Sequence, residues 1–327
     1  MSQPSSSTVD AMNLVAQDMR GMDAVIERRL SSDVPLVGQI SRYIVAAGGK
    51  RLRPVLLLLM CGALGCRSDQ RLNLAAVVEF IHTATLLHDD VVDESTLRRG
   101  RATANEAFGN PASVLVGDFL YSRAFQMMLE AQDMRVMEVL AEATNVIAEG
   151  EVQQLMNMHD ASLSEEDYLS VIRSKTAKLF EASARLAALL AKSEPSIEAA
   201  CADYGQALGT AFQVIDDVLD YDGDVAEMGK NLGDDLREGK VTLPLIIAMQ
   251  KANSAQRAVI QTAIEGGGVE RMGEIIAIVQ DTGALAATRT RAAQEAQRAI
   301  DALSALPTSP YKEALHGLAA QLLERRA

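Results

Sequence analysis

Hydrophobic residues recur every three to four positions along most of the chain, which is the repeat of an amphipathic helix. No segment alternates hydrophobic and polar residues for long enough to predict a β-strand. The pattern therefore predicts an all-α fold built from long helices. These helices are expected at residues 9–30, 34–47, 54–64, 72–93, 112–130, 134–158, 165–191, 196–221, 242–252, 255–265, 269–280, 283–305 and 309–325.

Glycine and proline mark the ends of helices rather than the boundaries of domains. The pair Gly48-Gly49 interrupts the helical repeat, and Pro195 stands where a first-turn proline belongs. No linker or shift of composition divides the chain, so residues 9–327 are expected to form one domain. The polar, Ser-rich stretch at 1–8 is expected to be disordered.

Composition narrows the classes of protein that fit. The chain has 327 residues and a net charge of -13, which argues against a binder of nucleic acid or of anionic membranes. The N-terminus lacks the regions of a signal peptide, and the longest apolar run, 55–66, is too short to span a bilayer. Cys61, Cys66 and Cys201 fit reduced thiols, because no further cluster completes a metal site. We expect a soluble, cytoplasmic protein.

Two segments of the form Asp-Asp-x-x-Asp carry the clearest chemical signal. Positions i and i+4 share one helix face, so the first and last aspartates of each segment point the same way. Two carboxylates about 6 Å apart repel by roughly 3 kcal/mol at an effective dielectric constant near 20, which calls for a cation. Oxygen ligands favour Mg²⁺, which completes its shell with water and substrate phosphates. The aspartates are Asp89, Asp90 and Asp93 in the first segment, and Asp216, Asp217 and Asp220 in the second.

Basic residues flank the first acidic segment. Two glycines and three cations precede a proline at 48–54, and 97–101 holds three arginines. A glycine-rich helix start and forked guanidinium groups both suit phosphate, although either run alone also fits a solvated surface. His82 lies two helical turns before Asp89, where it is either a diphosphate ligand or an ordinary core or surface histidine.

Lysines surround the second acidic segment. Lys175 lies within a long predicted helix, and Lys230 and Lys240 lie in glycine-containing stretches that follow the aspartates. They suit a second phosphate-bearing ligand, and the alternative is a mobile solvated loop. Asp234 and Asp235 fit either supporting groups or a plain surface.

Five segments in this order resemble the trans-prenyltransferases, the isoprenyl diphosphate synthases. A lone Asp-Asp-x-x-Asp is a weak signal, but the ordered set is specific. The segments are GGKRLRP at 48–54, LLHDDVVDESTLRRG at 86–100, SKTAKLF at 174–180, FQVIDDVLDYDGD at 212–224 and GKNLGDDLREGKVTLP at 229–244.

The resemblance implies an antiparallel helical bundle around a deep central cavity, a homodimer, and a role for each residue. Asp89, Asp93 and Asp216 would coordinate three Mg²⁺ ions, for which Mn²⁺ could substitute, with Asp90, Asp217 and Asp220 in support. The allylic diphosphate would be held by Arg98, Lys175, Lys230 and Lys240. The diphosphate of isopentenyl diphosphate would be held by Lys50, Arg53, His82 and Arg99. Oxygen atoms of Thr176 and Gln213 would lie near the developing allylic cation.

Product length depends on how deep the cavity is. One isoprene unit is about as long as a helical turn, roughly 5.4 Å, so the residues one turn before Asp89 would gate an early step. Ala84 and Thr85 are small there, whereas short-chain family members carry a bulky aromatic. Met127 and Met128 are candidates for the floor. The alternative for all four is ordinary helix packing.

Three more segments, 82–105, 108–128 and 149–157, resemble family members that make octaprenyl diphosphate for the ubiquinone side chain. A nonaprenyl product is the alternative, and either product implies at most peripheral membrane contact on release. A terpene cyclase would need only one diphosphate site, and a non-catalytic partner subunit should have lost aspartates or cations. A carboxylate di-iron bundle, which is built on Glu-x-x-His pairs, is a further alternative.

Overall fold

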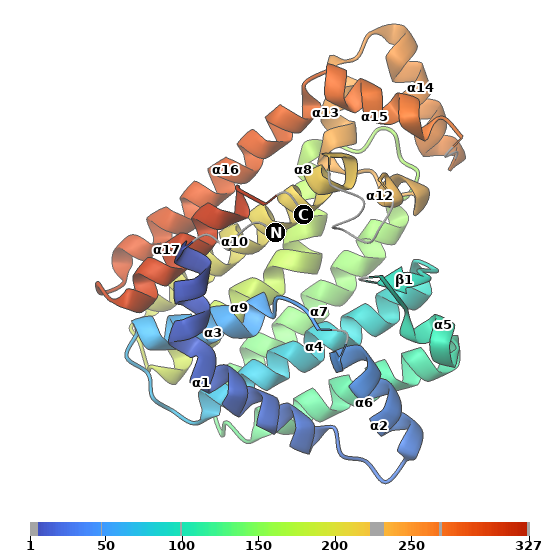
Figure 1. Cartoon of the computed structure of the whole chain (residues 1–327). Helices are drawn as coiled ribbons and strands as arrows, with labels where there is room; N and C mark the ends of the chain where they lie inside the picture. Colours follow the sequence, from blue (N-terminus) through green and yellow to red (C-terminus); the bar gives the residue numbers. More distant parts are fainter. Residues whose placement is uncertain (1–5, 47, 99, 223–231, 268–269, 326–327) are drawn as a thin grey trace. The chain divides into compact units, whose positions relative to one another are not determined.

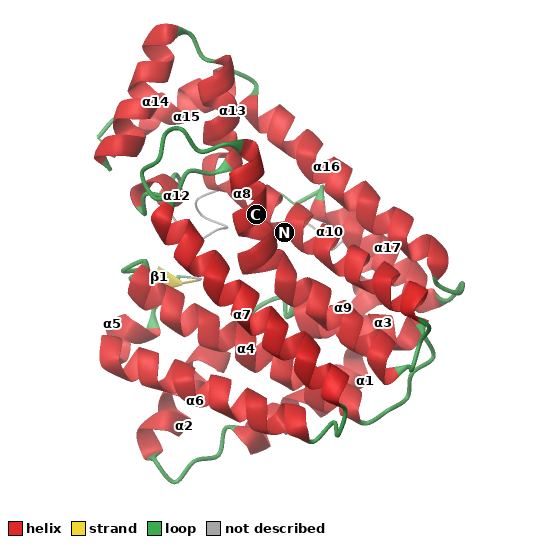
Figure 2. Ribbon diagram, turned by 180° about the vertical axis from the view of Figure 1, so that it is seen from behind, coloured by secondary structure: helices red, strands yellow, loops and turns green. Residues whose placement is uncertain are grey.

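The computed structural model describes residues 6–46, 48–98, 100–222, 232–267 and 270–325 (Figure 1). These residues are almost entirely helical (Figure 2), so the all-α prediction is confirmed. Among them, no helix is both long and apolar enough to cross a membrane. Of the stretch expected to be disordered, residues 1–5 lie outside the described residues, whereas Ser6–Thr8 begin the first helix.

Most helix boundaries lie within two residues of the predicted ones. The helices are α1 (Ser6–Arg29), α2 (Pro35–Ala46), α3 (Leu52–Ala63), α4 (Gln70–Val92), α5 (Ala104–Phe108), α6 (Asn110–Leu129), α7 (Met134–Met156), α8 (Glu165–Ile172), α9 (Lys178–Leu190), α10 (Pro195–Asp222), α12 (Asp234–Arg237), α13 (Leu243–Lys251), α14 (Ser254–Gly266), α15 (Met272–Asp281), α16 (Ala284–Ala302) and α17 (Pro310–Leu322). A π-helical turn, Arg173–Ala177, joins α8 to α9, and a 3-10 turn, Leu303–Ala305, follows α16.

The short helices α5 and α12 lie where the sequence predicted no element, and so does a two-stranded antiparallel ribbon. Its strands, β1 (Leu97–Arg98) and β2 (Arg101–Ala102), pair Leu97 with Ala102. Gly100, between the strands, has a φ of +71°, which a hairpin turn demands and glycine adopts freely. Strands of two residues are too short to show an alternating pattern.

The chain divides into two compact units. Unit 1 consists of residues 1–144, 179–205 and 301–318, and unit 2 of residues 145–178, 206–300 and 319–327. The first acidic segment therefore belongs to unit 1 and the second to unit 2.

In unit 1, close packing between α4 and α6 fixes the helix that carries the first acidic segment. A Cβ at Gly117 of α6 would come within 2.3 Å of the His88 ring, so only glycine lets the imidazole fit there. The same ring lies 3.2 Å from the carbonyl oxygen of Val114 and stacks on Tyr121. His88 thus holds α4 against α6 next to Asp89.

In unit 2, one side of α10 is buried against α13, α14 and α15. Val214, Ile215 and Leu219 are at most 3% exposed and belong to one apolar cluster with residues of those three helices. Because the apolar positions fill the core, Asp216 and Asp220 are left only half-buried.

Candidate functional site

The first acidic segment ends α4. The backbone N–H of Asp93 donates to the carbonyl of Asp89 at 2.8 Å, so the helical path continues through the motif and both side chains share one face. Both are half-buried, while Asp90, on another face, is fully buried. Asp89 and Asp93 can therefore reach a ligand, whereas the buried Asp90 cannot.

Arg98 neutralises the buried Asp90. Its Nε and Nη2 atoms donate to the same carboxylate oxygen at 3.0 and 2.6 Å. No described residue donates to the other oxygen, Oδ2. The contact anchors the ribbon on α4, so the arginine expected to hold the allylic diphosphate is bonded to an aspartate here.

The basic residues expected to bind isopentenyl diphosphate also lie in unit 1. Arg53, in the first turn of α3, places its guanidinium 4.5 Å above the Phe180 ring, which limits its orientations. Lys50 is exposed just before this helix, and His82 is half-buried on α4. Arg99 lies outside the described residues.

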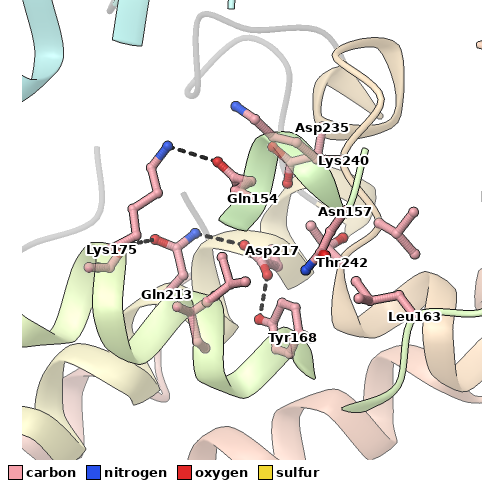
Figure 3. A pocket seen from close by; sticks show the side chains of 14 residues that line it. Gln154, Asn157, Leu163, Tyr168, Lys175, Gln213, Asp217, Asp235, Lys240 and Thr242 are labelled. Atoms are coloured by element: carbon pink, nitrogen blue, oxygen red, sulfur yellow. Dashed lines mark hydrogen bonds between the residues drawn. The ribbon is translucent and has the colours of Figure 1, made fainter. Parts of the chain in front are cut away.

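The second acidic segment is built into a hydrogen-bond chain in unit 2 (Figure 3). Asp217, only 2% exposed, accepts a short hydrogen bond from the Tyr168 hydroxyl and one of 2.8 Å from Nε2 of Gln213. The Gln213 amide oxygen in turn accepts from the Thr176 hydroxyl at 3.0 Å. Asp217 thereby fixes which way the Gln213 amide faces, and burial raises the pKa of Asp217 well above its usual range.

Asp220 faces the start of α12. Its carboxylate oxygens accept from the backbone N–H groups of Asp234 and Asp235 at 3.1 and 3.4 Å. Burial, and next the charge of Asp235, raise the pKa of Asp220 to about 9. A cation placed beside this carboxylate would favour its charged form and release the proton.

Asp216 pairs with a residue close to the C-terminus. Nη1 of Arg325 lies 2.8 Å from its carboxylate, and the guanidinium sits 4.8 Å from the centre of the Phe212 ring. The Asp216 side chain is 39% exposed, so it remains open to a ligand on one side.

The π-helical turn sets the position of Lys175 and Thr176. A wider turn inside an α-helix shifts the side chains it carries and often marks a functional site. Lys175 Nζ reaches back to α7, where it lies 2.5 Å from a Glu151 carboxylate oxygen. It also lies 2.8 Å from the Gln154 amide oxygen (Figure 3). A Cβ at Gly150 would come 2.8 Å from Cβ of Ser174 and 2.9 Å from the backbone nitrogen of Lys175. Only glycine at this position of α7 therefore lets the π-helical turn pack this closely.

A cavity of about 110 Å³ opens within unit 2 beside these groups. Polar groups line part of it, including Lys175, Thr176, Gln213 and Asp217, and apolar side chains such as Leu163 line the rest. Lys240 also lines it and pairs with Glu238 at 2.7 Å. Lys230 lies outside the described residues.

The candidate chain-length residues lie on α4 and α6 of unit 1. Ala84, Met127 and Met128 have no exposed surface. The Thr85 hydroxyl donates to the carbonyl of His82 at 2.8 Å, and Nδ2 of Asn73 donates to the carbonyl of Met127 at 2.9 Å. All four fit helix packing as well as a tunnel wall, so their role stays a prediction.

Comparison with known proteins decides the family. The sequence profile of the polyprenyl synthetase family matches residues 34–281, well over half of the chain. The chain belongs to the polyprenyl synthetase family. It is therefore a prenyltransferase, as the ordered motifs predicted.

Relatives within the polyprenyl synthetase family align along nearly the whole chain. Octaprenyl diphosphate synthase of Escherichia coli (strain K12) is 54% identical over 95% of this chain and 97% of its own length. The all-trans-nonaprenyl-diphosphate synthase of Rhodobacter capsulatus is 46% identical over 97% of each.

Solved structures of polyprenyl synthetases share the fold. A polyprenyl synthase from Caulobacter crescentus, complexed with calcium and isoprenyl diphosphate, matches with a TM-score of 0.95 at 44% identity over the full length of both chains. A decaprenyl diphosphate synthase from Rhodobacter capsulatus gives a TM-score of 0.93 at 45% identity, covering 98% of this chain and 99% of its own. The prediction of an isoprenoid-synthase type of helical fold is confirmed, whereas the deep central cavity stays a prediction.

The donor groups of this polyprenyl synthetase fit a hard divalent cation. Among the described residues, no three His, Cys, Asp or Glu side chains converge as a complete metal cage. Mg²⁺ does not need one, since it usually takes one or two carboxylates and completes its shell with phosphate and water. The half-buried pair Asp89 and Asp93, and the open side of Asp216, supply such carboxylates.

Sequence reasoning missed several groups that hold the predicted site residues in place. Tyr168 bonds to Asp217, 49 positions further along the chain. Glu151 and Gln154 contact Lys175, which lies 24 and 21 positions after them. The repeat within one helix does not predict contacts between residues this far apart. Arg325 was not singled out, because no spacing within one helix relates it to Asp216. Gly150 lies in the segment 149–157, which was considered only for its resemblance to the family. A glycine inside a predicted helix was the one sign that its position matters for packing.

Proposed function

We propose that the chain is a long-chain trans-polyprenyl diphosphate synthase. It adds isopentenyl diphosphate units head to tail onto an allylic primer, farnesyl diphosphate, and its product is octaprenyl diphosphate for the ubiquinone side chain. The observation that carries this proposal is the 54% identity to an octaprenyl diphosphate synthase along 95% of the chain. The presence of both acidic segments with their basic neighbours supports it.

Bound Mg²⁺, three ions held by Asp89, Asp93 and Asp216, would neutralise the diphosphate as the allylic C–O bond breaks. Mn²⁺ could replace it. Asp90, Asp217 and Asp220 would support these ligands. Lys175, Lys240, Lys230 and Arg98 would bind the same diphosphate and favour its departure. For Arg98 this requires a phosphate to share or replace the contact with Asp90.

Lys50, Arg53, His82 and Arg99 would bind the diphosphate of isopentenyl diphosphate, so that its alkene lies at attacking distance from the allylic cation. The Thr176 and Gln213 oxygens would stabilise that cation, because the Asp217 contact turns the amide oxygen of Gln213 away from the carboxylate. After the new C–C bond forms, loss of a proton to the released diphosphate regenerates an allylic diphosphate. Apolar walls would exclude water, which would otherwise capture the cation.

A direct assay tests the proposal. The purified protein is incubated with farnesyl diphosphate, labelled isopentenyl diphosphate and Mg²⁺, and product length is read by mass spectrometry. We expect a ladder that ends at forty carbons, complete loss with a chelator, and a loss of roughly a hundredfold or more in Asp89→Ala. A folded protein that incorporates no label would overturn the proposal in favour of a non-catalytic partner subunit.

A nonaprenyl product is the second candidate. The relative from Rhodobacter capsulatus with that product is 46% identical, and eight and nine units differ by about one helical turn of tunnel. A ladder that ends at forty-five carbons would favour it.

The proposed enzyme is a cytoplasmic homodimer. Large apolar side chains stand exposed on α6 and α7, and Leu115, Leu129 and Met134 are 63–70% exposed. Large apolar side chains this exposed are typical of interfaces, and the partner proposed for them is a second copy of the chain. Sedimentation should give a dimer that Leu115→Glu converts to a monomer, and a monomeric wild type would contradict this assembly.

A further inference from the structure

The C-terminal end of α3 brings two cysteines together. Gly65 has a φ of +69°, and its N–H donates to the carbonyl of Gly62 at 3.2 Å. The next residue, Cys66, donates its N–H to the carbonyl of Cys61 at 2.9 Å. These two bonds and the left-handed glycine make a Schellman motif, the standard way to close a helix with glycine.

This closure determines which side chains meet. In a Schellman motif the residue after the glycine usually contacts the residue five positions earlier, and that contact is normally apolar. Here both positions are cysteines, so the closure places the two thiols next to each other. A 6→1 backbone bond also holds the two residues at about the separation that a disulfide requires, with Cα atoms roughly 4.4–6.8 Å apart.

The surroundings hold this thiol pair in place and polarise it. Arg71 of α4 donates to the carbonyl groups of Arg67 and Ser68, directly after the pair, and its other N–H groups are held by both carboxylate oxygens of Asp18. The neighbouring Cys61 thiol has the largest influence on the pKa of Cys66. Together with the Ser68 N–H and Arg71 it outweighs burial and lowers the pKa of the Cys66 thiol to about 6.

The two thiols differ in their exposure to solvent. Cys66 is 8% exposed and Cys61 1%, so a small oxidant meets Cys66 first. The low pKa makes Cys66 the thiolate of the pair, and thiolates are the form that peroxides attack. Cys61 keeps its proton, because the neighbouring Cys66 thiol and burial raise its pKa.

We propose that Cys61 and Cys66 form an oxidisable thiol pair that hydrogen peroxide converts into an intramolecular disulfide. Peroxide oxidises the Cys66 thiolate, with one proton, to a sulfenic acid and releases water. The Cys61 sulfur then attacks the Cys66 sulfur, and the hydroxyl leaves with the Cys61 proton as a second water. In total, two thiols lose two electrons and two protons, and one peroxide becomes two waters. The inference concerns only these thiols and does not depend on the proposed function.

Mass spectrometry of the full-length protein tests this inference. No Lys or Arg separates the cysteines, so trypsin leaves both in one peptide, residues 52–67. After peroxide, we expect that peptide to become lighter by about 2 mass units and to resist alkylation until it is reduced. The number of alkylatable thiols in the unfolded protein should fall from three to one, with Cys201 as the internal control.

Two single variants separate the steps. Cys61→Ser should leave a Cys66 sulfenic acid that dimedone traps, whereas Cys66→Ser should keep Cys61 as a thiol under the same dose. Both variants place a serine where a small thiol stood, and circular dichroism checks that they fold. Three thiols still alkylatable after peroxide, or a disulfide that joins two chains, would overturn the inference.

Discussion

At the scale of single residues, the buried pair Tyr168 and Asp217 shows how a site residue is held by a group outside the motif. The tyrosine hydroxyl fixes Asp217, and Asp217 fixes the amide of Gln213. In the proposed reaction Gln213 lies beside the allylic cation, whereas Tyr168 acts on it only through Asp217. Tyr168 is therefore a positioning residue in the proposed reaction.

Tyr168→Phe should cost about 1–2 kcal/mol of unfolding free energy, because a buried hydrogen bond is lost. It should also lower kcat roughly tenfold or more while leaving KM nearly unchanged, since the misplaced amide acts after binding. Denaturant unfolding and steady-state assays measure both.

Tyr204→Phe is the matched control. Tyr204 is likewise buried and donates to the carbonyl of Leu315 at 2.7 Å. It lies 12 residues before Asp216 on α10, roughly 18 Å away along the helix. We expect a similar loss of stability with an unchanged kcat. Equal losses of kcat in the two variants would reduce Tyr168 to a general stability role.

At the scale of elements, the π-helical turn depends on a glycine in α7. Gly150→Ala places a methyl group under 3.0 Å from the backbone of the turn, which has to move. We expect a stability cost of about 1–3 kcal/mol from overpacking and a fall in kcat of roughly tenfold or more. Turnover and thermal unfolding report the two effects.

Gly273→Ala serves as the control for that substitution. Gly273 also lies inside a helix of unit 2, but no atom lies within 4 Å of the position of its added Cβ. It should stabilise the protein by about 0.5–1 kcal/mol and leave turnover intact. If Gly150→Ala also stabilises the protein and leaves turnover intact, the π-helical turn does not depend on close packing against Gly150.

A second element-scale contact joins three helices of unit 1 and gives a pH dependence. Glu198, 6% exposed in the first turn of α10, accepts from Arg135 of α7 at 2.7 and 2.9 Å and from Arg185 of α9 at 2.7 Å. Burial alone would raise the pKa of Glu198, but the hydrogen bonds from Arg185 and Arg135 outweigh it and lower that pKa.

The sign of the effect follows from this lowered pKa. The folded state holds fewer protons than the unfolded state, so Glu198 adds stability above the ordinary Glu pKa of about 4.3 and loses it as pH falls through the folded value. Glu198→Gln should cost about 2 kcal/mol at pH 7, and the difference from wild type should shrink below pH 4. Urea unfolding at both pH values measures it, and Glu274→Gln, on the surface, should change little at either.

At the scale of the whole molecule, the sequence was informative about elements and less so about what surrounds each site. The repeat of α7 is strong enough that 134–158 was predicted and Met134–Met156 is found. The helix predicted at 165–191 contains a π-helical turn, which the apolar repeat does not distinguish from regular helix. Contacts such as Asp216 with Arg325 join residues 109 positions apart, and spacing within one helix carries no information on them.

Product length is the property of the whole enzyme that the chain-length residues should control. Ala84→Phe or Thr85→Phe should shorten the product sharply, because a ring would block the tunnel about one turn from Asp89. Met127→Ala or Met128→Ala should lengthen it by removing the floor. Chromatography of the products measures both, with Ala84→Ser as a control that keeps the side chain small. Unchanged product lengths in folded variants would assign these residues to plain packing.

The π-helical turn has a consequence for changes of chain length. A π-helical turn holds about one residue more than the α-helical turn it replaces, so removing one residue from Arg173–Ala177 would let the backbone close into regular α-helix while the residues on both sides keep their faces. The same deletion in the regular part of α9 would turn all following side chains by about 100°. A one-codon deletion in the turn should therefore harm folding less than turnover, because Lys175 and Thr176 would lose the positions that the wider turn gives them.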